Sequence, residues 1–265
     1  MTCEGRTAAL AAGHGALHKR AMVRHWRVQG RNAGRSTSST GGGMVGRSRR
    51  GPGLALAFAL SAVSCSRSQG VALADGPAPQ APGASAEIGK TAPGFTLQDL
   101  DGRSVRLADF RGKTVVLEWF NPQCPFVRMS HTKGSLKDAA ARHMKDGVVW
   151  LGIDSAASGK QGYDVDTIRG SVKLFGLSHP ILRDTSGAVG HLYGATNTPH
   201  MFVIDRAGTL VYGGAIDNSP DAEGASPQGG TLVNYVDAAL DDMAAGRPVR
   251  VSRTKAYGCG VKYGT

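Results

Sequence analysis

The fold is decided by residues 115–125, which read Val-Val-Leu-Glu-Trp-Phe-Asn-Pro-Gln-Cys-Pro. The run at 114–120 is apolar and rich in β-branched side chains, as expected of a strand that is buried on both faces of a sheet. Residues 121–123 interrupt this run, and Pro125 suits a first helical turn, where its missing N–H costs no hydrogen bond. We therefore predict a central strand at 114–120 followed by a helix at 124–145.

Shorter elements alternate on both sides of this stretch. The residue pattern predicts strands at 95–97, 104–107, 148–153, 201–204 and 209–212, and helices at 166–175 and 231–244. The last two strands flank a turn at 205–208 and should form a hairpin. A strand–helix–strand unit followed by a hairpin and a helix is typical of an α/β sandwich.

The basic charge of the chain is concentrated at one end. The 265 residues include 31 Lys and Arg against 20 Asp and Glu, a formal net charge of +11. Eleven of these basic residues and one acid lie in residues 1–74, which leaves 75–265 with a net charge of about +1. Nucleic-acid binding needs a basic surface on the folded part of a protein. We therefore predict no nucleic-acid partner.

Residues 44–74 have the pattern of a secretory signal. Arginines are followed by an apolar run at 54–63, which is shorter than the ~20 residues that a membrane-spanning helix needs. Cleavage after Ala74 would release a soluble chain, whereas lipidation at Cys65 would provide a membrane anchor. Both routes predict export, either to a bacterial periplasm or as a membrane-anchored lipoprotein, and a membrane is a partner only if Cys65 is lipidated.

Two further segments lack core-forming patterns. Residues 1–43 are rich in Gly, Ala, Ser and Arg, and we interpret them as a disordered or mis-assigned extension ahead of a start at Met44. Residues 75–86 are rich in Pro, Ala and Gly, a composition typical of a flexible linker. The folded part should therefore begin near residue 87.

The chain contains four cysteines: Cys3, Cys65, Cys124 and Cys259. Only Cys124 and Cys259 remain in a chain that begins at residue 75. In an exported protein two cysteines form a structural disulfide, a redox couple, or both at different moments. There is neither a C-x-x-C pair nor a His/Cys cluster at zinc spacing, so we predict no metal site and no cofactor.

Cys124 is the best candidate for a reactive residue. It follows the predicted buried strand and begins the predicted helix. Unsatisfied N–H groups and the positive end of the helix dipole favour a thiolate at that position, and the thiolate is the form that attacks a disulfide or a peroxide. The alternative is a structural cysteine, because cysteine side chains are often fully buried.

Three motifs carry a resemblance to a known family. Residues 89–102 resemble the opening G-x-x-A-P-x-F…D-x-x-G of the redoxin group, which includes alkyl hydroperoxide reductase and thiol-specific antioxidant proteins of the thioredoxin superfamily. Residues 115–125 resemble the thioredoxin strand and active-site turn, and 198–205 resemble its cis-proline segment. The resemblance implies a thioredoxin-like three-layer sandwich with a central mixed β-sheet over residues 87–245.

The resemblance also implies roles for individual residues. Cys124 matches the attacking cysteine, and Pro199 matches the cis-proline that lies against its sulfur. Glu118 matches the buried acid that exchanges a proton, for which burial should raise the pKa; the alternative is an edge-strand or salt-bridged acid. Two departures limit the match. Val127 replaces the second cysteine of C-x-x-C, and Asn121 replaces the threonine expected three residues before a peroxidatic cysteine, which puts peroxidase activity in doubt.

Cys259 lies in the remaining segment, a cysteine-bearing C-terminal tail at 246–265. Its glycine neighbours would let the backbone approach another group closely. The glycine-rich composition of the segment is typical of a mobile chain. We hypothesise that Cys259 folds back as the resolving thiol for Cys124. A free surface thiol and an intermolecular disulfide are the alternatives.

These observations predict an exported thioredoxin-fold oxidoreductase. Cys124 would attack either a protein disulfide or a hydroperoxide, Cys259 would resolve the product, and an external thiol reductant would restore the pair. A non-catalytic exported binding protein with a structural Cys124–Cys259 disulfide is the alternative.

Overall fold

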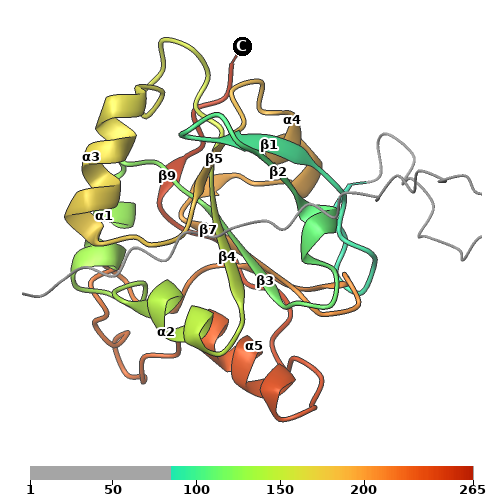
Figure 1. Cartoon of the computed structure of the whole chain (residues 1–265). Coiled ribbons are helices and arrows are strands. Elements are labelled where there is room, and N and C mark those ends of the chain that lie inside the picture. The colour runs from blue at the N-terminus through green and yellow to red at the C-terminus, as the bar shows by residue number, and fades with distance from the viewer. Residues whose placement is uncertain (1–84, 265) are drawn as a thin grey trace, which may run out of the picture. The chain divides into compact units, whose positions relative to one another are not determined.

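The computed structural model describes residues 85–264 (Figure 1). The extension at 1–43, the signal at 44–74 and nearly all of the linker at 75–86 lie outside the described residues, together with Cys3 and Cys65. The interpretations of these segments stay predictions.

Seven strands form one mixed sheet in the order β2-β1-β5-β4-β3-β7-β8. Strands β3, β4 and β5 run parallel, and the remaining neighbours pair antiparallel. Their bounds are β1 Thr96–Asp99, β2 Ser104–Arg106, β3 Val115–Trp119, β4 Val149–Asp154, β5 Ile181–Arg183, β7 His200–Ile204 and β8 Leu210–Gly214. The predicted hairpin is the β7–β8 pair at one edge of the sheet.

Helices cover both faces of this sheet. Their bounds are η1 Leu107–Phe110 (a 3₁₀ helix), α1 Pro125–Thr132, α2 Ala139–Lys145, α3 Val165–Phe175, α4 Ala188–Tyr193 and α5 Tyr235–Ala244. On one face, Trp119 of β3 packs in a core with Tyr193 of α4. On the other face, Val116 of β3 packs with Ala139 of α2 and Leu240 of α5, and Figure 1 shows these two helices together. The sequence therefore predicts β3 correctly as a fully buried interior strand of the sheet.

The single helix predicted at 124–145 is wrong, because the chain forms two helices there. α1 ends at Thr132, and a Cβ at Gly134 would collide with the backbone oxygen of Ala222. Asp138 then adopts a left-handed backbone conformation with φ 57° before α2 begins. A close approach between segments far apart in sequence therefore breaks a pattern that is helical when read locally.

Other boundaries also differ from the prediction. α5 begins at Tyr235 rather than 231, because the Asn234 side chain accepts a hydrogen bond from the N–H of Asp237 (3.0 Å) and caps the helix. β5 and α4 have three and six residues, and neither was predicted from the sequence. Such short elements show little periodicity of their own.

The C-terminal tail adds a second, two-stranded sheet. β6 (Asn197–Thr198) pairs antiparallel with β9 (Cys259–Gly260), so the tail returns to the segment that leads into β7 (Figure 1). The mobile segment predicted around Cys259 is instead held by backbone pairing. None of the helices in residues 85–264 combines the length and the apolar character needed to cross a membrane.

Candidate active site

Cys124 lies at the junction that the sequence predicts. The chain leaves the carboxyl end of β3, turns, and places Cys124 at the N-cap of α1 with Pro125 in the first turn. The Cys124 side chain is 0% exposed, and its Sγ donates a hydrogen bond to the backbone oxygen of Thr198 (3.0 Å). The helix N-terminus favours negative charge on this sulfur, so the position suits a thiol that reacts as the thiolate.

Asn121 and Val127 shape the turn around Cys124. The Asn121 side chain accepts a hydrogen bond from the N–H of Gln123 (2.9 Å) and donates one to the backbone oxygen of Gln161 (3.1 Å). Val127 is fully buried in the same apolar cluster as Cys124. Of the two residues that depart from the family pattern, Asn121 therefore stabilises the turn by hydrogen bonds, and Val127 packs in the core.

The segment carrying Pro199 faces Cys124. The Thr198–Pro199 peptide bond is cis, as the sequence predicts. Thr198 contributes twice to the site, because its carbonyl oxygen accepts the Cys124 thiol hydrogen bond and its strand position pairs with Cys259. Pro199 is itself buried. Its role in presenting a substrate strand stays a prediction.

The tail brings Cys259 to the same point. Cys259 is partly buried and packs against the cluster that contains Cys124, and both cysteines are free thiols. Burial raises the pKa of the Cys259 thiol, and the neighbouring Cys124 raises it further, to about 11. The structure therefore places together the two cysteines that the sequence separates by more than a hundred residues.

Side chains anchor the tail on both sides of Cys259. The backbone N–H of Thr254 donates a hydrogen bond to the carbonyl oxygen of Gly213 in β8. The Tyr263 ring stacks on His191 with 4.1 Å between ring centroids. The anchoring hydrogen bonds run from Ala215 N to Thr254 Oγ1 (2.9 Å), from Tyr257 OH to Asp217 Oδ1 (2.6 Å) and from Tyr263 OH to Ala195 O (2.7 Å). The position of Cys259 is thus set by contacts along the whole tail.

Glu118 is fully buried, but its pKa is shifted in the opposite direction from the prediction. Burial raises the pKa and is the largest influence, yet the charge and hydrogen bond of His131, with smaller contributions from His179 and Trp150, outweigh it. The His131 Nε2 lies 2.7 Å from Glu118 Oε1, and Trp150 Nε1 donates to Oε2 (3.0 Å). The pKa of Glu118 is therefore lowered, and the carboxylate is a buried group in contact with His131 and Trp150.

Among the described residues, no hydrogen bond joins Glu118 to Cys124. The proton-exchange role implied by the family resemblance stays a prediction. The link between the two residues runs through α1, which carries Cys124 at its N-cap and His131 in its last turn.

His131 lies beside Glu118 in the site region, and the sequence pattern assigned it no functional role. Its ring stacks on Phe175 of α3 with 5.3 Å between centroids and an interplanar angle of 8°, and it lies edge-on to Phe120. Its place seven residues after Cys124 on a predicted helix was the available signal, because a helix returns to the same face at that spacing. His131 therefore ties α1 to both β3 and α3.

Asp154 is a second buried carboxyl that sequence reasoning missed. It ends β4, is 1% exposed, and burial raises its pKa to about 7. Its Oδ2 has no hydrogen-bond partner, and Arg183 Nη1 lies 3.7 Å away. Nothing local distinguishes this residue in the sequence, because its burial comes from the neighbouring strand β5 and the loop after β4.

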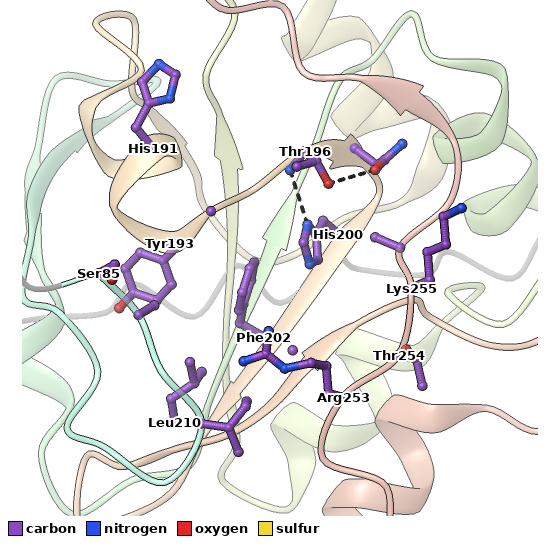
Figure 2. Close-up of a pocket in the computed structure, with 16 residues that line it drawn as sticks. Ser85, His191, Tyr193, Thr196, His200, Phe202, Leu210, Arg253, Thr254 and Lys255 are labelled. Carbon is purple, nitrogen blue, oxygen red and sulfur yellow. Dashed lines mark hydrogen bonds between the residues drawn. The ribbon is translucent and has the colours of Figure 1, made fainter.

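A cavity of about 370 Å³ lies beneath the first part of the tail and includes neither cysteine in its lining (Figure 2). His200 and Phe202 of β7 form one wall, and Arg253 and Lys255 of the tail form another. Burial lowers the pKa of His200 to about 4, and its Nδ1 accepts a hydrogen bond from the N–H of Thr196 (3.3 Å). Within residues 85–264, no three His, Cys, Asp or Glu side chains are grouped to hold a metal ion.

Comparisons with known proteins agree with this geometry. The Redoxin family model matches residues 87–226. The thiol-disulfide oxidoreductase ResA of Bacillus thuringiensis is 28% identical over 125 residues, which covers 47% of this chain and 68% of the relative. The chloroplastic peroxiredoxin Q of Triticum aestivum is 28% identical over 160 residues, which covers 55% of this chain and 70% of the relative.

A solved structure shows the same fold. A hypothetical protein from Sinorhizobium meliloti matches with a TM-score of 0.58 and 27% identity, over 68% of this chain and 97% of that one. The mixed sheet with flanking helices is therefore the thioredoxin-like α/β fold that the motifs predict. With the family model covering more than half of the sequence, the chain belongs to the Redoxin family of the thioredoxin superfamily.

Proposed function

We propose that this chain is a thiol-disulfide oxidoreductase whose redox-active pair is Cys124 and Cys259. One observation carries the proposal: the tail pairs Cys259 with Thr198, the residue whose carbonyl oxygen accepts the Cys124 thiol hydrogen bond. Cys259 also packs against the buried cluster that contains Cys124. This arrangement supplies the second cysteine that Val127 leaves out of the active-site turn.

The proposed reaction moves two electrons from the enzyme to a substrate disulfide. The Cys124 thiolate attacks one substrate sulfur, the substrate S–S bond breaks, and the other substrate sulfur leaves as a thiolate. Cys259, as a thiolate, then attacks the Cys124 sulfur of the mixed disulfide and releases the second substrate thiolate. The two substrate thiolates take up the protons that Cys124 and Cys259 gave up, and the substrate leaves as two thiols. The enzyme ends with a Cys124–Cys259 disulfide, and an external dithiol reduces it again.

Hydroperoxide reduction is a second candidate for the same pair, and the burial of Cys124 favours it. The Cys124 side chain is 0% exposed beneath a paired tail, so a small oxidant can reach it more easily than a protein can. In that reaction the Cys124 thiolate attacks the terminal peroxide oxygen, and an alcohol leaves after taking a proton. Cys259 then condenses with the sulfenic acid to give the disulfide and water.

We further propose that the protein acts after export, on the evidence of the signal-like pattern at 44–74. The proposed partners are a thiol reductant and either a disulfide-bearing protein or a hydroperoxide. An oxidising compartment is where a disulfide between Cys124 and Cys259 can persist.

Catalysis and a purely structural disulfide are separated by comparing cysteine variants of the full-length chain. Reduction of insulin disulfides and consumption of hydrogen peroxide are measured for the wild type, Cys124→Ser, Cys259→Ser and the matched control Cys65→Ser. The proposal expects Cys124→Ser to lose activity and Cys65→Ser to keep it. If the wild type shows neither activity, or Cys124→Ser retains what the wild type shows, the chain is a non-catalytic binding protein.

A further inference from the structure

The two sulfurs differ in their access to a large partner. Cys124 is 0% exposed beneath the cis-proline segment, whereas Cys259 is partly exposed in the tail. Thiol–disulfide exchange requires the attacking thiolate to reach the sulfur along the S–S axis. A protein thiolate therefore meets Cys259 first when the two cysteines are joined as a disulfide.

The backbone edge beside Cys124 is already occupied. β9 pairs with β6 through Thr198 and Cys259, and the adjacent Val261 N–H donates to the carbonyl oxygen of Thr196 (3.1 Å). Asn197 adds a side-chain hydrogen bond to the carbonyl oxygen of Gly258 (2.9 Å). A partner that adds a strand to a sheet needs an unpaired edge. The chain's own tail takes the place that such a partner would use at the β6 edge.

Leaving-group chemistry favours the same sulfur. Attack on Cys259 expels the Cys124 sulfur, which leaves as a thiolate at the N-terminus of α1, where negative charge is stabilised. Attack on Cys124 would instead expel Cys259, a thiol whose pKa is raised by burial and which lies in β9 rather than at a helix N-terminus. A better-stabilised thiolate leaves faster, so access and chemistry agree.

The tail that carries Cys259 is basic, which indicates the charge of the partner. Residues 246–264 contain five basic residues and no acidic residue. Two of them, Arg247 and Arg250, pair with Asp242. In the described part of the chain, Arg253, Lys255 and Lys262 make no ion pair, and the first two are exposed. An acidic face on the partner would complement this part of the tail.

We propose that a protein dithiol with an acidic face reduces the oxidised enzyme by attacking Cys259, and that Cys124 receives electrons only through Cys259. This inference rests on the proposed Cys124–Cys259 disulfide. The partner thiolate forms a bond to Cys259 Sγ, the Cys124–Cys259 bond breaks, and Cys124 leaves as a thiolate. The second partner thiolate attacks its own linked sulfur and releases Cys259, and Cys124 and Cys259 take up the two protons that the partner's thiols gave up. The partner ends as a disulfide and the enzyme as two thiols.

Trapping the mixed disulfide tests this order. Oxidised full-length wild type is mixed with a reduced, acidic thioredoxin whose second active-site cysteine is replaced by serine, so that the mixed disulfide cannot be resolved by the probe. The reaction is quenched with acid, remaining thiols are alkylated, and the linked peptides are identified by mass spectrometry. We expect adducts through Cys259 to exceed those through Cys124 by about tenfold or more.

Each outcome of the trapping experiment has a distinct meaning. Adducts mainly through Cys124 would overturn the inference. A disulfide that dithiothreitol reduces but that gives no adduct with the thioredoxin would overturn the assigned partner class. If the oxidised protein contains no Cys124–Cys259 disulfide at the start, the proposed function itself fails, and this is visible before any probe is added.

A charge variant tests the acidic partner separately. At low salt, we expect Lys255→Ser to slow adduct formation by roughly twofold to threefold, because one exposed attractive charge is lost. The matched control Lys145→Ser, at the end of α2, should leave the rate unchanged. The difference should vanish at high salt. Equal rates for the two variants at low salt would remove the charge argument.

Discussion

The two halves of the candidate site are built in different ways. Cys124 belongs to the core of the fold: it follows the fully buried strand β3, caps α1 and is itself 0% exposed. Cys259 belongs to a two-residue strand in a tail that is held by backbone pairing to β6 and by side-chain anchors on both sides. One sulfur is positioned by the sheet and a helix, and the other by the strand pairing and side-chain anchors of the tail.

This difference assigns different tasks to the two residues. A thiol fixed at a helix N-terminus is suited to be the attacking thiolate, because its charge is stabilised in place. A partly exposed thiol on a tail that pairs beside Cys124 is suited to bring a second sulfur to the first and to meet external partners. The predictions that follow change one side of the site while leaving the other intact.

The largest effect is expected from Cys124→Ser. Removing the attacking sulfur should lower the rate of disulfide or peroxide reduction by at least about a hundredfold, because serine at this position is a far weaker nucleophile. Steady-state turnover measures this loss, and circular dichroism should show an unchanged fold. Retention of more than a tenth of the activity would mean that Cys124 is not the nucleophile.

Cys259→Ser should lower turnover less than Cys124→Ser does. It should also leave an unresolved intermediate on Cys124. The first attack by Cys124 remains, but the intermediate is not resolved, so multiple turnover should fall by about tenfold while a single turnover survives. Mass spectrometry should find a mixed disulfide or a sulfenic acid on Cys124. Normal turnover in this variant would show that Cys259 is not the resolving thiol.

Gly258→Ala tests the docking of the tail without altering either sulfur. Gly258 has φ 105°, and a Cβ there would collide with the backbone oxygen of Thr198, so the β6–β9 pairing should be lost. We expect Cys124 to be alkylated about tenfold faster in the reduced protein, because the tail no longer covers it.

Gly260→Ala is the matched control for that variant. A Cβ at Gly260 would lie 4.0 Å from the Thr196 oxygen, which is an ordinary contact, so the tail should stay docked. Equal alkylation rates for the two variants would show that the tail does not limit access to Cys124.

The smallest of these expected effects is the change in stability caused by Glu118→Gln. The folded-state pKa of Glu118 lies below the unfolded value, so its carboxylate adds stability above the unfolded pKa, near 4.5, and this stability is lost as the pH falls through the folded-state pKa. The variant should be less stable than the wild type by roughly 2 kcal/mol at neutral pH, with the difference shrinking in acid.

Denaturant unfolding at several pH values measures this difference. Glu223→Gln is the control, because Glu223 forms a surface pair with Lys133 and its loss should cost less than about 0.5 kcal/mol. A gap between wild type and Glu118→Gln that is the same at pH 7 and in acid would contradict the lowered pKa of Glu118.

The sequence predicted the parts of the site that depend on local pattern. The apolar run before Cys124 and Pro125 in the first helical turn gave the strand and the helix start, and the family resemblance of residues 198–205 gave the cis bond. Each of these features depends on a pattern of consecutive residues, so it can be recognised without the tertiary structure.

The parts that were missed depend on contacts between distant segments. The break between α1 and α2 follows from the approach of Gly134 to Ala222, and the lowered pKa of Glu118 follows from His131 on a neighbouring helix. The docking of Cys259 uses a strand of two residues, which is too short to carry a periodic signal. A hypothesis of pairing with Cys124 was available from cysteine counting, but its geometry was not.

Disulfide mapping of the oxidised protein tests the central claim most directly. The full-length chain is oxidised with a mild thiol oxidant, free thiols are alkylated, and the unreduced protein is digested for mass spectrometry. The account predicts one peptide pair linked through Cys124 and Cys259 in a monomeric chain, and its loss in either Cys→Ser variant. Alkylated Cys124 and Cys259 after complete oxidation, with no linkage between them, would contradict it.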